Sequence, residues 1–284
     1  NKTKTCGINE SFVVVKQYKE LKKLFGAKNL TDISEILEDV RQKKTEEEIK
    51  HIKKACKITD EIFTKLVQNF RFTTESEVKS FLLKEFFDRG LEQSFDPVVA
   101  SGLNAAVPHH NKLTKLNSGF LVLDFGVKYK GYCSDMTRTI YLGKPTEKEL
   151  ETYNNLLKIQ KSTINLARIE VRKKGKIEAS KLDKHVRASL GTDEKYFFHG
   201  LGHGFGVEIH ERPNLFSHSK DIIRTNMVFT IEPGIYIPSK KLGIRIEDDI
   251  LVKGKTLELL TKSRKDLVIV NKRSKKNNKR KTTR

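Results

Sequence analysis

Two aspartates within an apolar hairpin limit the possible folds of this chain more than any other feature of the sequence. Residues 121–139 read LVLDFGVKYKGYCSDMTRT, in which apolar residues flank Asp124 on both sides and Gly126 opens a polar turn. The return strand carries Asp135, so we expect the two carboxylates on neighbouring strands. An ionised carboxylate in apolar surroundings is costly unless it is compensated, and a divalent cation compensates a pair most cheaply.

The hairpin by itself supports two interpretations. In the first, Asp124 belongs to a tight turn and Asp135 pairs with Arg138, so that both acids are structural. The second half of the chain favours the other interpretation, a metal site, because Glu232 and Glu247 also stand in apolar strand-like runs, MVFTIEPGIYIP and LGIRIEDDILV. If the two halves pack face to face, four acids converge, and two divalent metal ions would neutralise them.

Helix, helix, loop and hairpin follow one another twice along the sequence. Thr45, Thr74 and Thr146 each precede a glutamate by three positions, which is the pattern of a helix-capping box. The expected helices span about 45–70, 74–90, 146–169 and 178–190. We therefore predict an α+β fold with a pseudo-twofold repeat of helix-helix-β-hairpin, a shared curved antiparallel sheet and helices on the outside.

The two ends of the chain carry weaker signals. Residues 1–44 contain one strand-like run, SFVVVK, and a short amphipathic stretch at 31–41, so we interpret them as a remnant of an N-terminal domain or a linker. Residues 268–284 end in fourteen residues that hold eight basic side chains and no acid. We expect these residues to form a basic disordered tail.

Composition narrows the class of protein. The net charge is +20, from 56 basic and 36 acidic residues, which allows weak non-specific nucleic-acid contact through the basic tail. No apolar run approaches the roughly 20 residues that cross a bilayer, so we expect no membrane association. The three cysteines have spacings unlike a zinc motif, which indicates reduced thiols and a cytoplasmic protein.

A glycine-rich segment supplies candidate histidine ligands. The run FFHGLGHGFGVEIHERP carries His199, His203 and His210 among glycines, which argues against a helix and for close approach of the backbone to a ligand. Three histidines so close together, beside an acid cluster, favour a functional site over separate structural roles. His109, which follows Pro108 before the first hairpin, is a fourth candidate.

In combination these residues resemble the creatinase/methionine-aminopeptidase superfamily, whose catalytic domain has the pita-bread fold. The motifs ASGLNAAVPH, GYCSDMTRT, HGLGHGFGVEIHERP, TIEPGIY and GIRIEDD are similar to those of its Xaa-Pro aminopeptidase and prolidase branch of M24-type metallopeptidases. The resemblance covers residues 45–267 and implies that they form the catalytic domain. It also implies a metal-ligand set of Asp124, Asp135, His203, Glu232 and Glu247.

The same resemblance implies roles for the residues around the ligands. Glu232, His210 and His109 are the expected catalytic residues, and His109, His199, His210 and Arg245 are expected to contact the substrate. Two divalent metal ions are the expected cofactors. The oxygen-rich ligand set favours manganese, with cobalt, zinc and iron as alternatives.

The activity that the resemblance implies is hydrolysis of the peptide bond before proline by a dinuclear exopeptidase, either an aminopeptidase or a dipeptidase. Two alternatives are a catalytically idle pita-bread module that binds protein or nucleic acid, and a methionine aminopeptidase, which would lack GIRIEDD. The expected partners are proline-containing peptides. Xaa-Pro peptidases also form homodimers with the help of an N-terminal domain, of which residues 1–44 would be the remnant.

Overall fold

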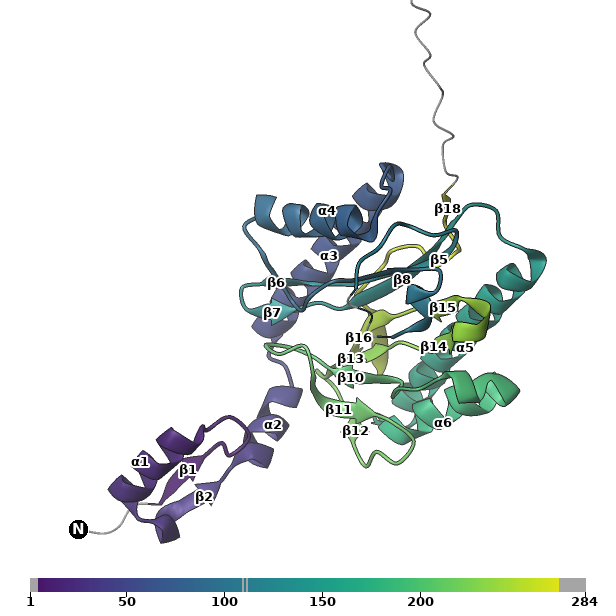
Figure 1. Cartoon of the computed structure of the whole chain (residues 1–284). Helices are drawn as coiled ribbons and strands as arrows, with labels where there is room; N and C mark the ends of the chain where they lie inside the picture. The colour runs from purple at the N-terminus through teal and green to yellow at the C-terminus, as the bar shows by residue number, and fades with distance from the viewer. Residues whose placement is uncertain (1–4, 109, 111, 271–284) are drawn as a thin grey trace, which may run out of the picture.

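The structure, a computed structural model, describes residues 5–108, 110 and 112–270 (Figure 1). His109 and residues 271–284, which make up most of the predicted basic tail, lie outside the described residues. Within these bounds, no helix is long and apolar enough to span a membrane.

A small N-terminal unit stands beside the main body of the molecule (Figure 1). It consists of β1 (Cys6–Ile8), α1 (Val15–Phe25), η1 (Ala27–Asn29), β2 (Leu30–Asp32) and α2 (Ser34–Gln42), and β1 pairs with β2 in parallel. The strand predicted for SFVVVK is wrong, because this run begins in a turn and its last two residues, Val15 and Lys16, begin α1. The helical spacing of the apolar residues after Val15 outweighs the preference of a β-branched run for a strand.

The helices of the main body are α3 (Glu46–Gln68), α4 (Glu75–Asp88), α5 (Glu147–Lys174) and α6 (Ala179–Leu190). Three of these four helices begin where capping boxes predict, and the fourth, α6, begins without a side-chain cap. Thr45, Thr74 and Thr146 each accept a hydrogen bond from the backbone N–H three residues later, so the three predicted capping boxes are confirmed. Helix α5 continues beyond the predicted end at residue 169 and stops at Gly175, whose φ of +68° lies in the left-handed region.

The first hairpin is long and is interrupted in the middle. Strand β5 (Gly119–Phe125) pairs antiparallel with β8 (Met136–Leu142), and beyond the interruption β6 (Val127–Tyr129) pairs with β7 (Tyr132–Cys133). Strand β4 (Val98–Ser101) lines the other edge of β5, β3 (Glu92–Gln93) pairs with β6, and β18 (Ile269–Val270) pairs with β8.

The second hairpin repeats this design. Strand β13 (Val228–Ile231) pairs antiparallel with β16 (Asp248–Lys253), and beyond an interruption β14 (Gly234–Ile237) pairs with β15 (Leu242–Arg245). The remaining elements are η2 (Asn104–Ala106), β9 (Ile177–Glu178), η3 (Gly191–Tyr196), β10 (Gly202–Gly204), β11 (Glu211–Leu215), β12 (Ile222–Ile223), η4 (Pro238–Lys240) and β17 (Thr256–Leu259). The predicted repeat of helices followed by a hairpin is therefore present in both halves.

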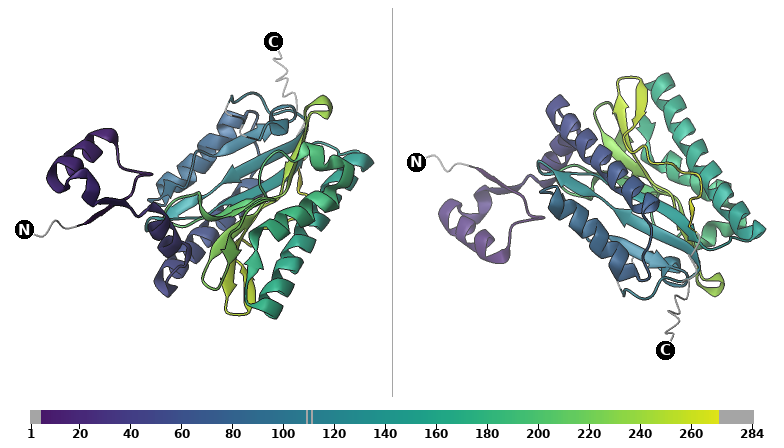
Figure 2. Two further views of the ribbon diagram at one scale, coloured as in Figure 1. Left: turned by 90° about the horizontal axis from the view of Figure 1, so that it is seen from below. Right: turned by 90° about the horizontal axis from the view of Figure 1, so that it is seen from above.

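The two halves meet along β8, which runs beside the turn from β15 into β16. The backbone N–H of Glu247 donates to the carbonyl of Thr137 at 3.1 Å, and the hydroxyl of Thr139 donates to the carbonyl of Arg245 at 2.8 Å. One large apolar cluster lies between the first sheet and α3 and α4, and another lies mainly between the second sheet and α5 and α6. A third, smaller cluster joins the two halves, with Cys56 of α3 packed among residues such as Val228 of β13 and Leu251 of β16. Figure 2 shows the result, with strands in the middle and helices on the outside.

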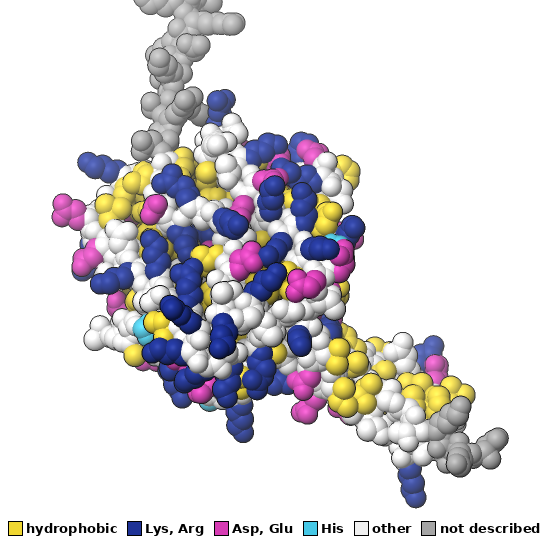
Figure 3. All heavy atoms as spheres, turned by 180° about the vertical axis from the view of Figure 1, so that it is seen from behind, with side chains coloured by type: hydrophobic (Ala, Val, Ile, Leu, Met, Phe, Trp, Pro, Cys, Tyr) yellow, Lys and Arg dark blue, Asp and Glu magenta, His cyan; other side chains and the backbone are white. Residues whose placement is uncertain are grey.

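The surfaces of the two parts differ. Lysine and arginine side chains are spread over the main body, whereas apolar side chains are exposed on the N-terminal unit (Figure 3). The exposed apolar residues of this unit include Phe12, Val15, Leu24, Ile36 and Val40, and helix α1 buries no residue. Residues 5–42 therefore have too small an interior to form a core of their own.

Candidate metal centre

The interruptions of the two hairpins hold the four acids that the sequence singles out. Asp124 lies near the end of β5, and Asp135 stands directly before β8. Glu232 follows β13, and Glu247 directly precedes β16. The acids therefore occupy equivalent places in the two halves, at the point where each ladder of backbone hydrogen bonds breaks.

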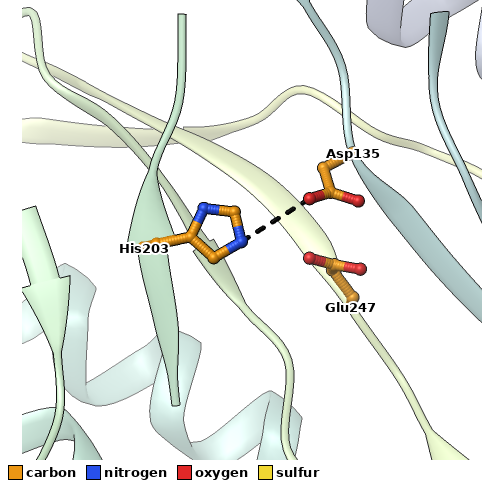
Figure 4. Close-up of side chains that lie close together, drawn as sticks. All are labelled: Asp135, His203 and Glu247. Carbon is orange, nitrogen blue, oxygen red and sulfur yellow. Dashed lines mark ion pairs between the residues drawn. The ribbon is translucent and has the colours of Figure 1, made fainter. Parts of the chain in front are cut away.

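Packing of the two halves brings these acids and one histidine to the same cavity. Its volume is about 470 Å³, and its walls include Asp124, Asp135, His203, Glu232 and Glu247. One potential ligand atom from each of Asp135, His203 and Glu247 lies within 4.8 Å of the other two (Figure 4). The Nε2 atom of His203 is 3.6 Å from Asp135 Oδ2 and 3.4 Å from Glu232 Oε1.

The other candidate site residues that the structure describes also line this cavity. They are His199, His210 and Arg245. The His210 ring packs edge-on against His203 with a centroid distance of 4.4 Å, and His199 Nε2 lies 3.0 Å from the hydroxyl of Tyr236. The sequence thus identified side chains from distant segments that share one pocket. His109 lies outside the described residues, so its expected place in the pocket stays a prediction.

The electrostatics of the cavity show an excess of buried negative charge. Burial raises the pKa of Asp135 and of Glu247 well above the usual range, and the neighbouring carboxylates raise both further. Burial also raises the pKa of Glu232 to about 8, against an opposing effect of Arg245. The pKa of His203 falls to about 4, because the ring is buried and His210 is close. Without a bound cation, these buried side chains are therefore more stable in their neutral forms.

Arginines compensate only part of this charge. Arg245 donates to Asp124 Oδ2, to the Tyr236 hydroxyl at 2.9 Å and to the Thr137 hydroxyl at 2.9 Å. The structural interpretation in which Asp135 pairs with Arg138 is wrong, because Arg138 is buried on the far side of β8 and forms its ion pair with Asp248 at 2.8 Å.

The donor set fits a divalent cation. Among the described residues, three buried carboxylate oxygens have no hydrogen-bond partner: Asp124 Oδ1 and Glu247 Oε1 at the cavity, and Oδ1 of Asp249, which lies beside it. A buried carboxylate oxygen without a donor is rare in native proteins, and a cation is the partner that would satisfy it. Carboxylates with one imidazole form the mixed oxygen and nitrogen set that divalent first-row metals accept.

Sequence reasoning missed the side chains that hold the acids in place. The hydroxyl of Thr137 donates to Glu247 Oε2 at 2.7 Å, and that of Thr230 donates to Glu232 Oε1 at 3.1 Å. Asp249 Oδ2 accepts the backbone N–H of Asp135 at 2.9 Å. All three residues stand two positions from one of the four acids, a spacing that places side chains on the same face of a strand and is the signal that would have identified them.

Solved structures with the same architecture confirm the predicted pita-bread fold. The structure of an X-Pro aminopeptidase from Thermotoga maritima superposes with a TM-score of 0.85 at 32% identity, and the match covers 94% of this chain and 76% of that one. A Xaa-Pro dipeptidase from Bacillus anthracis gives a TM-score of 0.86 at 37% identity, covering 94% of this chain and 75% of that one.

Sequence comparison gives the family. The profile of metallopeptidase family M24 matches residues 50–254, and this chain belongs to that family. It is 37% identical over 272 residues to a Xaa-Pro dipeptidase of Pyrococcus horikoshii, a match that covers 93% of this chain and 75% of the relative. Metallopeptidases of this family imply divalent metal ions, and the buried acidic group described above is able to bind metal.

Proposed function

We propose that this chain is a metal-dependent Xaa-Pro peptidase. The observation that carries the proposal is the convergence of acids from both halves, two of them with an unpartnered buried oxygen, on one cavity. Membership of family M24 gives the reaction class, and the relatives named Xaa-Pro dipeptidase and X-Pro aminopeptidase give the substrate class, which is proline-containing peptides.

The proposed ligands are the five donors that line the cavity, namely Asp124, Asp135, His203, Glu232 and Glu247. We propose two divalent ions, with manganese preferred because four of the five donors are carboxylates. When bound, such ions supply Lewis-acid polarisation of the scissile carbonyl and a more acidic water.

The side chains of this chain have distinct proposed tasks in the reaction. Glu232 accepts a proton at its carboxylate, with Oε1 oriented by the hydroxyl of Thr230. His210, packed against His203 at the cavity wall, donates a hydrogen bond to the carbonyl oxygen of the scissile bond. His199 and Arg245 contact the peptide, and Arg245 also orients Asp124. His109 is proposed as a further catalytic and substrate-contacting residue on sequence grounds alone.

The cavity also suits a peptide that contains proline. Its walls include the apolar side chains of Phe95, Val98, Ile209 and Phe216, which can pack against a pyrrolidine ring. A proline amide has no N–H to donate, so shape rather than hydrogen bonding selects it.

We also propose that residues 45–267 form the catalytic domain and that residues 1–44 are an attached remnant or linker. The M24 profile begins and ends inside the first range. The attachment combines ion pairs and backbone contacts. Arg41 and Lys44 each pair with Glu211, at 2.6 and 2.7 Å, and the backbone N–H of Lys44 donates to the carbonyl of Asn226 at 2.7 Å. Glu211 directly follows His210, so this contact reaches the wall of the site.

The test of the proposed function is a turnover assay on three peptides. Protein loaded with Mn²⁺ or Co²⁺ is expected to cleave Ala-Pro or Ala-Pro-Ala and to leave Met-Ala intact; the preferred peptide separates dipeptidase from aminopeptidase activity. Glu232→Gln is expected to lower kcat by at least about 100-fold. The control is Glu151→Gln, which changes an exposed acid on α5. Folded, metal-loaded protein that cleaves neither proline peptide would contradict the proposal.

A further inference from the structure

A fully buried glutamate outside the cavity has no part in the chemistry described so far. Glu75 lies in the first turn of α4 with an exposed fraction of 0%, and no cation pairs with it among the described residues. Its two oxygens instead accept hydrogen bonds of 2.7–3.2 Å from the backbone N–H and hydroxyl of Ser101, the side-chain amide of Asn104, and the backbone N–H and hydroxyl of Thr114. A carboxylate satisfied only by donors in this way replaces its lost hydration without a counter-ion.

All these donors belong to one stretch of chain. Ser101 ends β4, Asn104 begins η2, and Thr114 lies on the chain that returns toward β5. The backbone N–H of Glu75 also donates to the carbonyl of Thr114 at 2.9 Å. A single carboxylate on a helix therefore ties together the start, the 3₁₀ turn and the far end of this stretch.

The tied stretch reaches the metal pocket in two places. Val98, three residues before Ser101, is the register partner of Asp124 and lines the cavity. Turn η2 packs directly on β15, where a Cβ placed on Gly243 would lie 1.7 Å from the carbonyl oxygen of Ala105. Gly243 is two residues from Arg245, and the Arg245 guanidinium donates to the carbonyl of Pro108 at 3.5 Å.

We propose that Glu75 is a positioning residue for peptide binding: it fixes residues 101–108 between β5 and β15, and so fixes the guanidinium of Arg245 against Asp124 at the pocket wall. This inference rests on the proposed peptidase function for its kinetic consequence. The geometry on which it stands is independent of that function. Glu75 contacts none of the proposed metal ligands and reaches Asp124 through residues 101–108 and Arg245, so we expect its loss to change substrate binding more than metal binding.

The first arm of the test uses Glu75→Gln in the full-length, Mn²⁺-loaded protein. Glutamine has nearly the volume of glutamate but only one acceptor oxygen. Its amide N–H₂ group would face the groups that donate to the second carboxylate oxygen of Glu75. We expect KM for the cleaved proline peptide to rise at least about tenfold, kcat to change less, and Mn²⁺ affinity measured by calorimetry to stay within about threefold of wild type.

The matched control is Glu77→Gln. Glu77 lies in the same turn of α4 but is exposed, and it accepts hydrogen bonds from the N–H groups of Thr73 and Thr74 at the helix start. Its loss destabilises α4 without touching residues 101–108, so KM is expected to stay at the wild-type value. An equal rise of KM in Glu75→Gln and Glu77→Gln would overturn the proposal, because helix stability would then explain both.

The second arm does not depend on peptidase activity. Lys112 is exposed within the tied stretch and offers a trypsin site. Cleavage after Lys112 is expected to be at least about tenfold faster in Glu75→Gln than in wild type or Glu77→Gln. The inference would be overturned if Glu75→Gln had both the KM and the tryptic cleavage rate of wild type. If the wild-type protein were inactive on peptides but trypsin cleaved the variant faster, only the peptidase function would be contradicted.

A milder variant covers the case in which Glu75→Gln does not fold. Asn104→Ala removes one side-chain donor to Glu75 and leaves the carboxylate in place. We expect changes in the same direction, of about threefold in both KM and cleavage after Lys112. Absence of both changes in folded Asn104→Ala would count against the proposal.

Discussion

At the scale of single residues, two carboxylates of the site each have two oxygens that differ in surroundings. Glu247 Oε2 accepts the hydroxyl of Thr137, while Oε1 is buried without a hydrogen-bond partner among the described residues. Asp124 repeats this asymmetry, with Arg245 on Oδ2 and no partner on Oδ1. One oxygen of each acid is thus oriented by the protein, and the other is left for a cation. Such partners of one oxygen fix the orientation of a carboxylate toward a metal.

The pH dependence of stability is a prediction at this scale. In metal-free protein, burial raises the pKa of Glu232 from 4.5 to about 8, so the folded state holds a proton that the unfolded state releases. The contribution of Glu232 to the free energy of unfolding should therefore be largest below about pH 4.5. It should fall as the pH rises to about 8, by about 1.4 kcal/mol per pKa unit. Asp135 and Glu247 act in the same direction.

Urea unfolding of chelator-treated protein between pH 5 and pH 8 measures this slope. Glu232→Gln removes one titrating group and should flatten the slope, while saturating Mn²⁺ should reverse the loss of stability at high pH, since the ion binds the ionised acids. Identical slopes for metal-free wild type and Glu232→Gln would show that Glu232 does not retain its proton in the folded state.

At the scale of elements, a close contact of backbones creates the interruption of the first hairpin. A Cβ on Gly126 would lie 1.8 Å from the carbonyl oxygen of Ser134, so only glycine lets the two backbone segments approach this closely. Asp124 and Asp135 flank this contact on either side of the hairpin. The break in the ladder of backbone hydrogen bonds therefore turns both acids toward the cavity.

Two glycine substitutions in this hairpin test that account. Gly126→Ala should lower the free energy of unfolding by about 2–4 kcal/mol and weaken Mn²⁺ binding at least about tenfold, because the clash moves the segments that carry both acids. Gly131→Ala at the hairpin tip is the control: its φ is +84° and nothing lies within 4 Å of an added Cβ. It should cost about 1 kcal/mol and leave Mn²⁺ affinity unchanged. Thermal melts and calorimetry measure both quantities; equal metal affinity in the two variants would contradict the account.

The same elements show what the sequence predicts and what it does not. The helix starts at Thr45, Thr74 and Thr146 follow from local hydrogen bonds, and the five proposed donors follow from the order of the motifs, which is specific as a set. The strand expected for SFVVVK failed, since the apolar spacing after Val15 specifies a helix. The hydrogen bond from the backbone N–H of Asp135 to the carboxylate of Asp249 joins residues 114 positions apart. It depends on how the two halves pack, and no local sequence pattern encodes that packing.

At the scale of the whole molecule, the cavity lies on the joint between two halves whose two larger apolar clusters are distinct and which share a third, smaller one. Asp135 comes from the first half, whereas His203 and Glu247 come from the second, and the three side chains converge within 4.8 Å. The direct backbone link beside them is the hydrogen bond from Glu247 to Thr137. A cation bound to ligands from both sides would therefore stabilise the joint more than either core.

Amide hydrogen exchange with and without metal tests this whole-molecule prediction. Protein saturated with Mn²⁺ at about 100 times Kd should gain about 2.7 kcal/mol of stability, and removal of the ion should speed exchange of the Glu247 amide more than exchange within α3 or α5. The control is His203→Ala, which loses one proposed ligand from the second half. With Mn²⁺ present at the same concentration, it should exchange at the joint like chelated wild type. Equal acceleration of amide exchange at the joint and in both cores would contradict the prediction. It would mean that the metal stabilises the whole protein as one cooperative unit and not the joint in particular.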